Sequence, residues 1–301
     1  MKKLTIAITA VALIGTPALA APPLPAPVYS WTGFYAGLNV GWGWGGQDTT
    51  ANFPGPEVSR ANVTIVGSAS IPVQNAPIAF QESTNPTGVI GGVQAGYNWQ
   101  SIANLIFGVE ADFQGSGESA SGNTYQNARQ LAHLGIANPP GPPAETFVNT
   151  SQSISQSVAL SWFGTVRGRV GHTVSPTVML YGTGGLAYGR LNQSVAASYD
   201  LSATCAAPCS GTATLANGTV VPLPFTGNQI LRSSTTRTGW TIGGGIEGAV
   251  PNTRVTWKAE YLYVDLGTAD YRFSGSGLGT IAVSTRFTTN IVRVGLNYQF
   301  H

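Results

Sequence analysis

Charge is scarce in this 301-residue chain, because only 9% of its residues are Asp, Glu, Lys or Arg, against about 25% in ordinary soluble domains. The formal net charge of +2 is too small to indicate a nucleic-acid partner. A soluble protein with so few charges is prone to association. The composition therefore favours a chain whose apolar surface faces lipid.

Long apolar runs are absent beyond the first twenty residues, since no later segment has the roughly 18 apolar residues of a membrane-spanning helix. A membrane location therefore requires strands. The first twenty residues have the pattern of a signal peptide. Lys2 and Lys3 precede an apolar stretch over 4–14, and Ala18-Leu19-Ala20 forms a small-residue cleavage site. The stretch is too short for a membrane anchor, so we predict that 1–20 is removed on export.

Cysteine and histidine are also rare. Cys205 and Cys209 lie in a polar CAAPC segment, and in an exported protein such a pair predicts a local loop disulfide rather than a metal or redox site. The three histidines fall in a loop (His133), at a turn (His172) and at the chain end (His301). We find no Ser/His/Asp arrangement and no metal-ligand cluster. The sequence therefore predicts no enzyme and no cofactor.

Alternation of apolar and polar residues is abundant. From Val292 to Phe300 every second residue is apolar, and the residues between them are Arg, Gly, Asn and Gln. A period of two is typical of a strand with one apolar and one polar face. In the segment 158–170 the same pattern places Val158 and Leu160 on the apolar face. Including 290–300, we predict eight strands, the other seven at 31–44, 89–99, 105–114, 158–170, 178–188, 240–247 and 254–263.

Long and short connections alternate between these segments. Long polar loops are predicted over 45–87, 118–154, 193–235 and 268–284, whereas the connections near 101, 172–176 and 250–253 are short. Short periplasmic turns and long outside loops are typical of outer-membrane barrels. We predict an all-β fold: an eight-stranded antiparallel up-and-down transmembrane β-barrel over 31–301, after a Pro-rich periplasmic lead over 21–30.

Aromatic residues sort by height when the strands are traced up and down, as expected for rings at the two lipid–water boundaries. The belt at the short-turn end comprises Trp31, Tyr97, Trp99, Trp257, Tyr298 and Phe300. The belt at the loop end comprises Trp42, Trp44, Trp240, Tyr261 and Tyr263.

Charged residues fall on the inward faces of the predicted strands. An eight-stranded barrel is just wide enough for its own side chains to fill, and unpaired charges there are costly, so we predict a neutralising ion-pair network. The network is either structural filling or a gate, and inward glycines leave room for a narrow water path. Its members are Glu110, Asp112, Arg167, Arg169, Glu247, Lys258, Glu260 and Arg293.

Three segments resemble one family. WTGFYAGLNVGWGWGG at 31–46, YGTGGLAYG at 181–189 and VGLNYQF at 294–300 are similar to the small outer-membrane β-barrel (porin-like) surface proteins of alphaproteobacteria. The resemblance covers nearly the whole mature chain. It implies a barrel similar to the membrane domain of outer-membrane protein A, inserted by the barrel assembly machinery through the C-terminal strand. His301 departs from the family pattern, which ends on the aromatic residue.

Two classes of function are compatible with these features. One is a structural and surface-display protein of the Gram-negative outer membrane, in contact with its lipid and lipopolysaccharide. The other is a narrow porin for small solutes, or a surface binder of a ligand such as haem through the loops. The sequence leaves open whether the protein conducts solutes, the ligand, the oligomeric state and any contact of 21–30 with peptidoglycan. It also leaves open whether the loop 45–87 adds short strands above the membrane.

Overall fold

The structure, a computed structural model, describes residues 29–53, 58–65, 67–72, 78–101, 104–136, 144–205, 210–215, 220–275 and 279–300. The predicted signal peptide, most of the Pro-rich lead and His301 lie outside this part of the chain. All regular elements in it are strands. It contains no helix long and apolar enough to cross a membrane.

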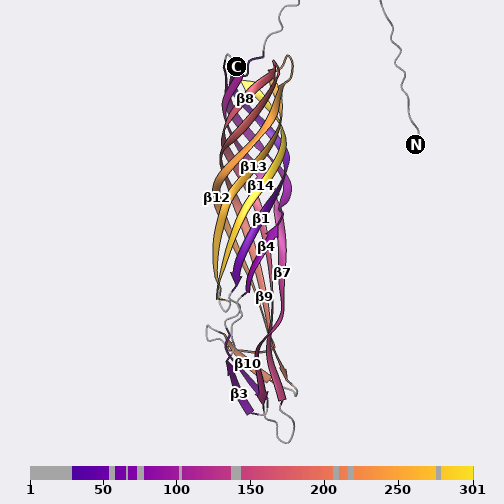
Figure 1. The fold of residues 1–301 in the computed structure, drawn as a ribbon, viewed down its shortest axis with the longest axis vertical. Coiled ribbons are helices and arrows are strands. Elements are labelled where there is room, and N and C mark those ends of the chain that lie inside the picture. Colours follow the sequence, from indigo (N-terminus) through magenta and orange to yellow (C-terminus); the bar gives the residue numbers. More distant parts are fainter. Residues whose placement is uncertain are drawn as a thin grey trace, which may run out of the picture.

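Eight strands form a closed ring of antiparallel pairs. Figure 1 shows them wound around one another in an elongated body. β1 pairs with β14 along one edge and with β5 along the other. The remaining neighbours follow in the order β14, β13, β12, β9, β8, β6, β5. This confirms the predicted eight-stranded barrel. The strands are β1 (Gly33–Phe53), β5 (Thr87–Gln100), β6 (Leu105–Ser116), β8 (Ala144–Ser175), β9 (Val178–Cys205), β12 (Phe225–Ala249), β13 (Val255–Gly275) and β14 (Gly279–Phe300).

Each strand turns one face outward and one into the barrel. In β6, Phe107 and Val109 are about half exposed, while Glu110 between Val109 and Ala111 is buried. The same period holds in β14, where Leu296 is 60% exposed and Arg293 is buried. An apolar outer face and a polar inner one are what the bilayer requires of a spanning strand. The alternation therefore assigned these faces correctly.

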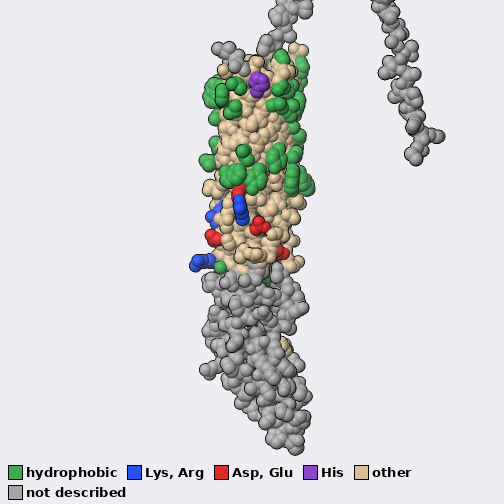
Figure 2. All heavy atoms as spheres, in the orientation of Figure 1, with side chains coloured by type: hydrophobic (Ala, Val, Ile, Leu, Met, Phe, Trp, Pro, Cys, Tyr) green, Lys and Arg blue, Asp and Glu red, His purple; other side chains and the backbone are tan. Residues whose placement is uncertain are grey.

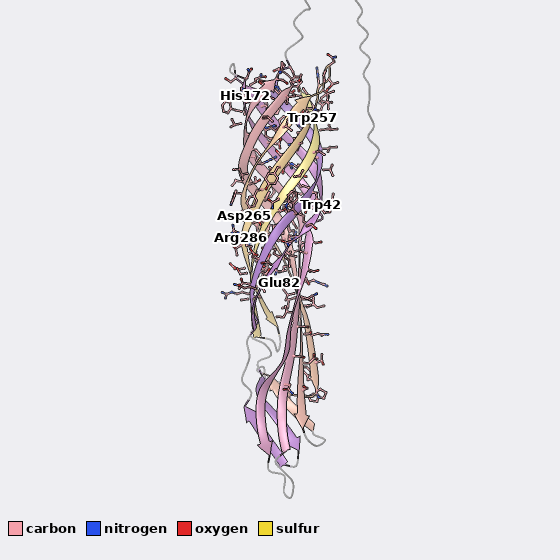
Figure 3. The ribbon with its side chains drawn as sticks, turned by 45° about the vertical axis from the view of Figure 1, so that its right-hand side comes forward. Trp42, Glu82, His172, Trp257, Asp265 and Arg286 are labelled. Carbon is pink, nitrogen blue, oxygen red and sulfur yellow. The ribbon has the colours of Figure 1, made fainter. Side chains whose placement is uncertain are left out.

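Three short connections lie at one end of the barrel, at 101–104, 176–177 and 250–254. Asn104 and Asn252 each adopt a φ of 59° there, a left-handed conformation that Asn tolerates better than most residues. Figure 3 places His172 at this end. In outer-membrane barrels short turns are expected at the periplasmic end.

The long connections are largely strands. This answers the question left open for 45–87, whereas the prediction of loops over 118–154 and 193–235 was wrong. β4 (Ile78–Thr84) pairs with the part of β1 that follows its pairing with β5. β7 (Ser119–Ile136) pairs with the part of β8 that precedes its pairing with β6. Ser, Thr and small apolar residues alternate along these segments, and continuing an existing ladder satisfies their backbone groups. At the far end of Figure 1, a second sheet contains β2 (Val58–Ile65), β3 (Gly67–Pro72), β10 (Ser210–Leu215) and β11 (Val220–Leu223).

The outward placement of Val158 and Leu160 was also wrong, because both side chains are buried inside the barrel. The register of β8 against β9 shifts between Leu160 and Trp162, so Ser161 is an extra residue. A β-bulge of this kind interrupts the two-residue period. On β8, even-numbered residues that precede Ser161, such as Leu160, therefore face inward. Even-numbered residues that follow it, such as Val166, face outward.

Two single-residue deletions, one of the bulge residue and one of a residue after it, test whether Ser161 is the extra residue of β8. Removing Ser161 leaves Leu160 and Phe163 facing inward, so we expect a folded barrel with a nearly unchanged urea midpoint. Removing Thr165 forces either Phe163 or Arg167 onto the wrong face. Because an Arg facing lipid at mid-bilayer costs about 2–4 kcal/mol, we expect a large loss of stability or no folding. Urea titration of the two variants in micelles, followed by electrophoresis without boiling, measures both. Equal sensitivity to the two deletions would contradict the bulge.

Candidate functional site

Eight charged residues of the lumen form one cluster. In the described part of the chain a further buried carboxylate, Glu118, has no ion pair with this cluster and accepts a hydrogen bond from Thr289 Oγ1 at 2.7 Å. All eight predicted members are buried, and ion pairs or hydrogen bonds connect them. They come from β6, β8, β12, β13 and β14. Four carboxylates face four cations, so the cluster is neutral as a whole. The structure therefore brings together every charged residue that the inward faces predicted.

Arg167 and Arg293 lie at the centre of this cluster. Arg167 donates to Asp112 Oδ2 at 3.0 Å and to Glu260 Oε1 at 3.1 Å, and it also donates to Glu110. Arg293 donates through Nε to Glu260 Oε2 at 2.7 Å and through an Nη to Asp112 Oδ2 at 2.8 Å. The two guanidiniums therefore share both of these carboxylates. Charge-assisted bonds of this kind fix geometry as well as adding energy.

Lys258 and Arg169 complete the cluster. Lys258 Nζ donates to both oxygens of Glu110, at 2.9 and 3.1 Å. Arg169 donates to Glu247 Oε2 at 2.7 Å and lies 3.5 Å from Glu110 Oε2. Glu110 therefore contacts cations from three sides.

Four uncharged residues of the site were missing from the predicted network. The Tyr35 hydroxyl donates to Glu110 at 2.7 Å, and the Tyr181 hydroxyl donates to Glu260 at 3.0 Å. Thr256 and Asn297 both donate to Glu247 Oε1, at 2.7 and 3.0 Å. Tyr35, Thr256 and Asn297 could have been recognised, because the alternation of their strands places them on the inward face. Tyr181 could not, because the glycines of its strand obscure which face is inward.

Two of the inward glycines, Gly96 and Gly245, do not border open space. A Cβ on Gly96 would lie 2.4 Å from the Tyr35 hydroxyl, and a Cβ on Gly245 would lie 2.7 Å from the Tyr181 hydroxyl. The space beside these glycines is thus occupied by the two phenol rings. Arg169 also lies over the Tyr181 ring, with Cζ 4.0 Å from its centroid. The glycines allow the tyrosines to reach the carboxylates.

An apolar layer fills the lumen on the far side of the charged cluster from the turns. In β14, Ile291 follows Arg293 at the next inward position, and in β13 Leu262 follows Glu260 in the same way. Phe163 and Leu160, on either side of the bulge, both contribute to the layer. The layer comprises Ile90, Leu160, Phe163, Ala187, Leu191, Leu262, Val264, Leu266, Phe287 and Ile291.

A second apolar layer closes the turn end, and it contains Trp31. Trp31 was predicted in the lipid-facing belt, but it is only 1% exposed and packs with Ile106, Met179 and Tyr181 inside the barrel. Its backbone N–H donates to Gln100 Oε1 at 2.9 Å. Gly33 has a φ of 145°, which side chains disfavour, and there the chain turns from the lumen into β1. The belt prediction was therefore wrong for Trp31.

The other predicted belt residues point outward, and Figure 2 shows apolar side chains gathered in two bands on the visible face. Charged side chains lie beyond the band that is further from the turns. Trp257 lies near the turn end and Trp42 lies further along (Figure 3). Phe113, Trp162 and Tyr188 add to the second band, with ring centroids 5.4 and 6.2 Å apart.

The remaining predicted residues form no site in the described part of the chain. Cys205 ends β9, and Cys209, with which a disulfide was predicted, lies outside the described residues. His172 is exposed beside a turn, and the side chain of His133 is not described. Among the described residues there is no group of three or more potential metal ligands.

A closed ring of eight amphipathic strands around a neutral polar interior defines a small integral-membrane β-barrel. The chain belongs to the outer membrane protein beta-barrel domain family, whose model matches residues 6–300. This confirms the predicted family and the predicted location in the outer membrane.

Relatives from alphaproteobacteria match most of the chain. The 31 kDa outer-membrane immunogenic protein of Brucella melitensis is 33% identical over 283 residues, which cover 92% of this chain and 88% of that protein. The 22 kDa outer membrane protein of Rhizobium leguminosarum is 28% identical over 221 residues, 73% of this chain and 71% of that one. The solved structure of Neisserial surface protein A is 15% identical and covers 89% of this chain and 98% of that one. Its TM-score is only 0.26, so the fold assignment rests on the strand pairing.

Replacing Arg293 by Met tests the charged cluster. Because Asp112 and Glu260 would lose a shared cation in a buried site, we expect the free energy of unfolding to fall by about 3–5 kcal/mol. Urea titration in micelles measures this change. The matched control is Arg286→Met: Arg286 pairs with Asp265 at 2.7 Å, but its side chain is 57% exposed, so we expect little effect. If both variants unfold at the same midpoint as the native protein, the cluster is not stabilising.

Proposed function

We propose that this protein is a structural and surface-display protein of the outer membrane, with a barrel closed to solutes. The observation that carries the proposal is the filling of the lumen. A neutral ion-pair cluster lies between two apolar layers, one around Phe163 and Ile291 and the other around Trp31. A hydrated solute would have to displace all three layers. We therefore favour structural filling over a gate.

The length of the strands supports a display role. β8 has 32 residues, whereas a strand needs about 9–11 residues to cross the hydrocarbon core. Most of the excess lies beyond Trp162, on the side away from the periplasmic turns. There the sheet continues and the second sheet of β2, β3, β10 and β11 is built. The names of two relatives, which call them outer-membrane immunogenic proteins, support a surface that is exposed outside the cell.

We infer that the protein is not an enzyme, because the carboxylates of the charged cluster are bound to cations and a buried carboxylate outside it, Glu118, is enclosed in the barrel beside Thr289. Catalysis needs a group that a substrate can reach. Binding of the barrel assembly machinery to β14 is part of the same proposal, since β14 is the strand that closes the ring against β1.

Solute permeation separates this proposal from a narrow porin. We expect liposomes containing the native protein not to swell in small sugars, and planar bilayers containing it to show no steady current. We also expect Arg293→Met to lower thermal stability without opening a current, because the apolar layers remain. Controls are protein-free liposomes and liposomes containing a known wide porin. A current that appears only in Arg293→Met would favour the gate, and swelling with the native protein would overturn the closed barrel.

A further inference from the structure

Two arginines lie on the outer wall just beyond the aromatic band that is further from the turns. Arg190 on β9 is the register partner of Trp162 on β8, one of the rings in that band. Arg232 on β12 is exposed further from the membrane, opposite Ser194. Aromatic bands mark the lipid–water boundary, so Arg190 lies at the depth of the lipid headgroups.

Hydrogen bonds connect this part of the wall across three strands. Arg190 Nε donates to Ser234 Oγ at 2.7 Å, and Ser234 Oγ donates to Asn192 Oδ1 at 2.7 Å. Asn192 Nδ2 donates in turn to Ser161 Oγ at 2.5 Å, where Ser161 is the bulge residue of β8. These bonds hold the Arg190 guanidinium in place. In the described part of the chain its terminal nitrogens have no acceptor.

A shallow hollow accompanies these residues. It has a volume of about 340 Å³ and includes Asn192, Ser194, Arg232 and Ser234 among its lining residues. Arg232 has neither an ion pair nor a hydrogen bond to any residue that the structure describes. We name Arg190, Asn192, Arg232 and Ser234 the arginine patch.

No acid neutralises the arginine patch within its own strands. The sequence contains no Asp or Glu over 151–163, 188–199 or 227–240, which are the parts of β8, β9 and β12 around it. Between the neighbouring strands β13 and β14, by contrast, Arg286 is paired with Asp265. The patch is therefore a cationic site without a counter-ion from the surrounding parts of β8, β9 and β12.

The same three strands offer an apolar track between the patch and the turns. Leu186 and Ile242 are more than half exposed, and the outward glycines Gly168, Gly182 and Gly184 leave the wall flat between them. A Cβ on Gly168 or Gly182 would meet no atom closer than 4.0 Å. A ligand with a phosphate at one end and acyl chains at the other would match both surfaces.

We propose that the arginine patch binds the phosphorylated headgroup of an outer-leaflet glycolipid, whose acyl chains lie along β8, β9 and β12. Arginine is suited to this role because its planar guanidinium binds phosphate oxygens in pairs. The surrounding serines and Asn192 supply donors for the sugar hydroxyls. The proposal requires the outer-membrane location but is independent of whether the lumen conducts.

Lipid binding by the purified barrel tests the proposal. The protein is delipidated in micelles, mixed with bisphosphorylated lipid A, and bound lipid is counted by native mass spectrometry. We expect the native protein to retain lipid A at least tenfold more tightly than Arg190→Gln/Arg232→Gln, and Arg190→Lys/Arg232→Lys to restore part of the difference. The matched control is Arg272→Gln/Arg286→Gln, which removes two exposed arginines elsewhere and should retain lipid normally. Slower electrophoresis after boiling verifies that each variant is folded.

Two further ligands distinguish the lipid from a free anion. Dephosphorylated lipid A should bind as weakly to the native protein as lipid A does to the Gln variant. Inorganic phosphate should not displace bound lipid A at millimolar concentration. Equal retention by the native protein and the Gln variant, or equal loss in the Arg272/Arg286 control, would overturn the proposal. Displacement by inorganic phosphate would reduce the patch to an anion site without lipid selectivity, which also overturns it.

Discussion

Hydrocarbon offers no hydrogen-bond partners, and this constraint explains most of the structure. Every backbone group of a spanning strand must pair with another strand, so the sheet has to close on itself. Closure creates a lumen that lipid shields from water, and any charge inside it needs a partner within the protein. The neutral cluster around Arg167 and Arg293 satisfies this requirement. The outer wall satisfies the same constraint by being apolar between its two aromatic bands.

The sequence was informative wherever this constraint acts on each residue separately. Because lipid selects the outer face and the lumen selects the inner one, the two-residue period identified the eight strands and the charged residues that meet inside. It misplaced Val158 and Leu160, since Ser161 adds a residue that only the register of β8 against β9 reveals. It misplaced Trp31 for a related reason: a Trp before the first strand suits either an interface or a lumen, and the backbone of Gly33 decides between them.

Outside the membrane water supplies hydrogen-bond partners, and the alternation of apolar and polar residues becomes weaker. Water can solvate either face there, so Ser, Thr and Gly are acceptable at nearly every position and resemble loop composition. What makes these segments strands is the ladder already begun in the membrane, which β4 and β7 extend along β1 and β8. Such pairing depends on partners far away in the sequence. The mistaken loop assignment over 118–154, and the open question over 45–87, therefore reflect missing tertiary information rather than an error in reading the local pattern.

The bond between Tyr29 and Gln299 joins residues 270 positions apart, and the adjoining strands β1 and β14 pair along almost their entire length. Contacts so distant along the chain form slowly, because a long loop must close before any of them contributes. Until β14 has been synthesised and has paired with β1, one edge of β1 is unpaired and prone to aggregation. Because β14 follows the other barrel strands in the sequence, the ring can close only after β14 has been synthesised.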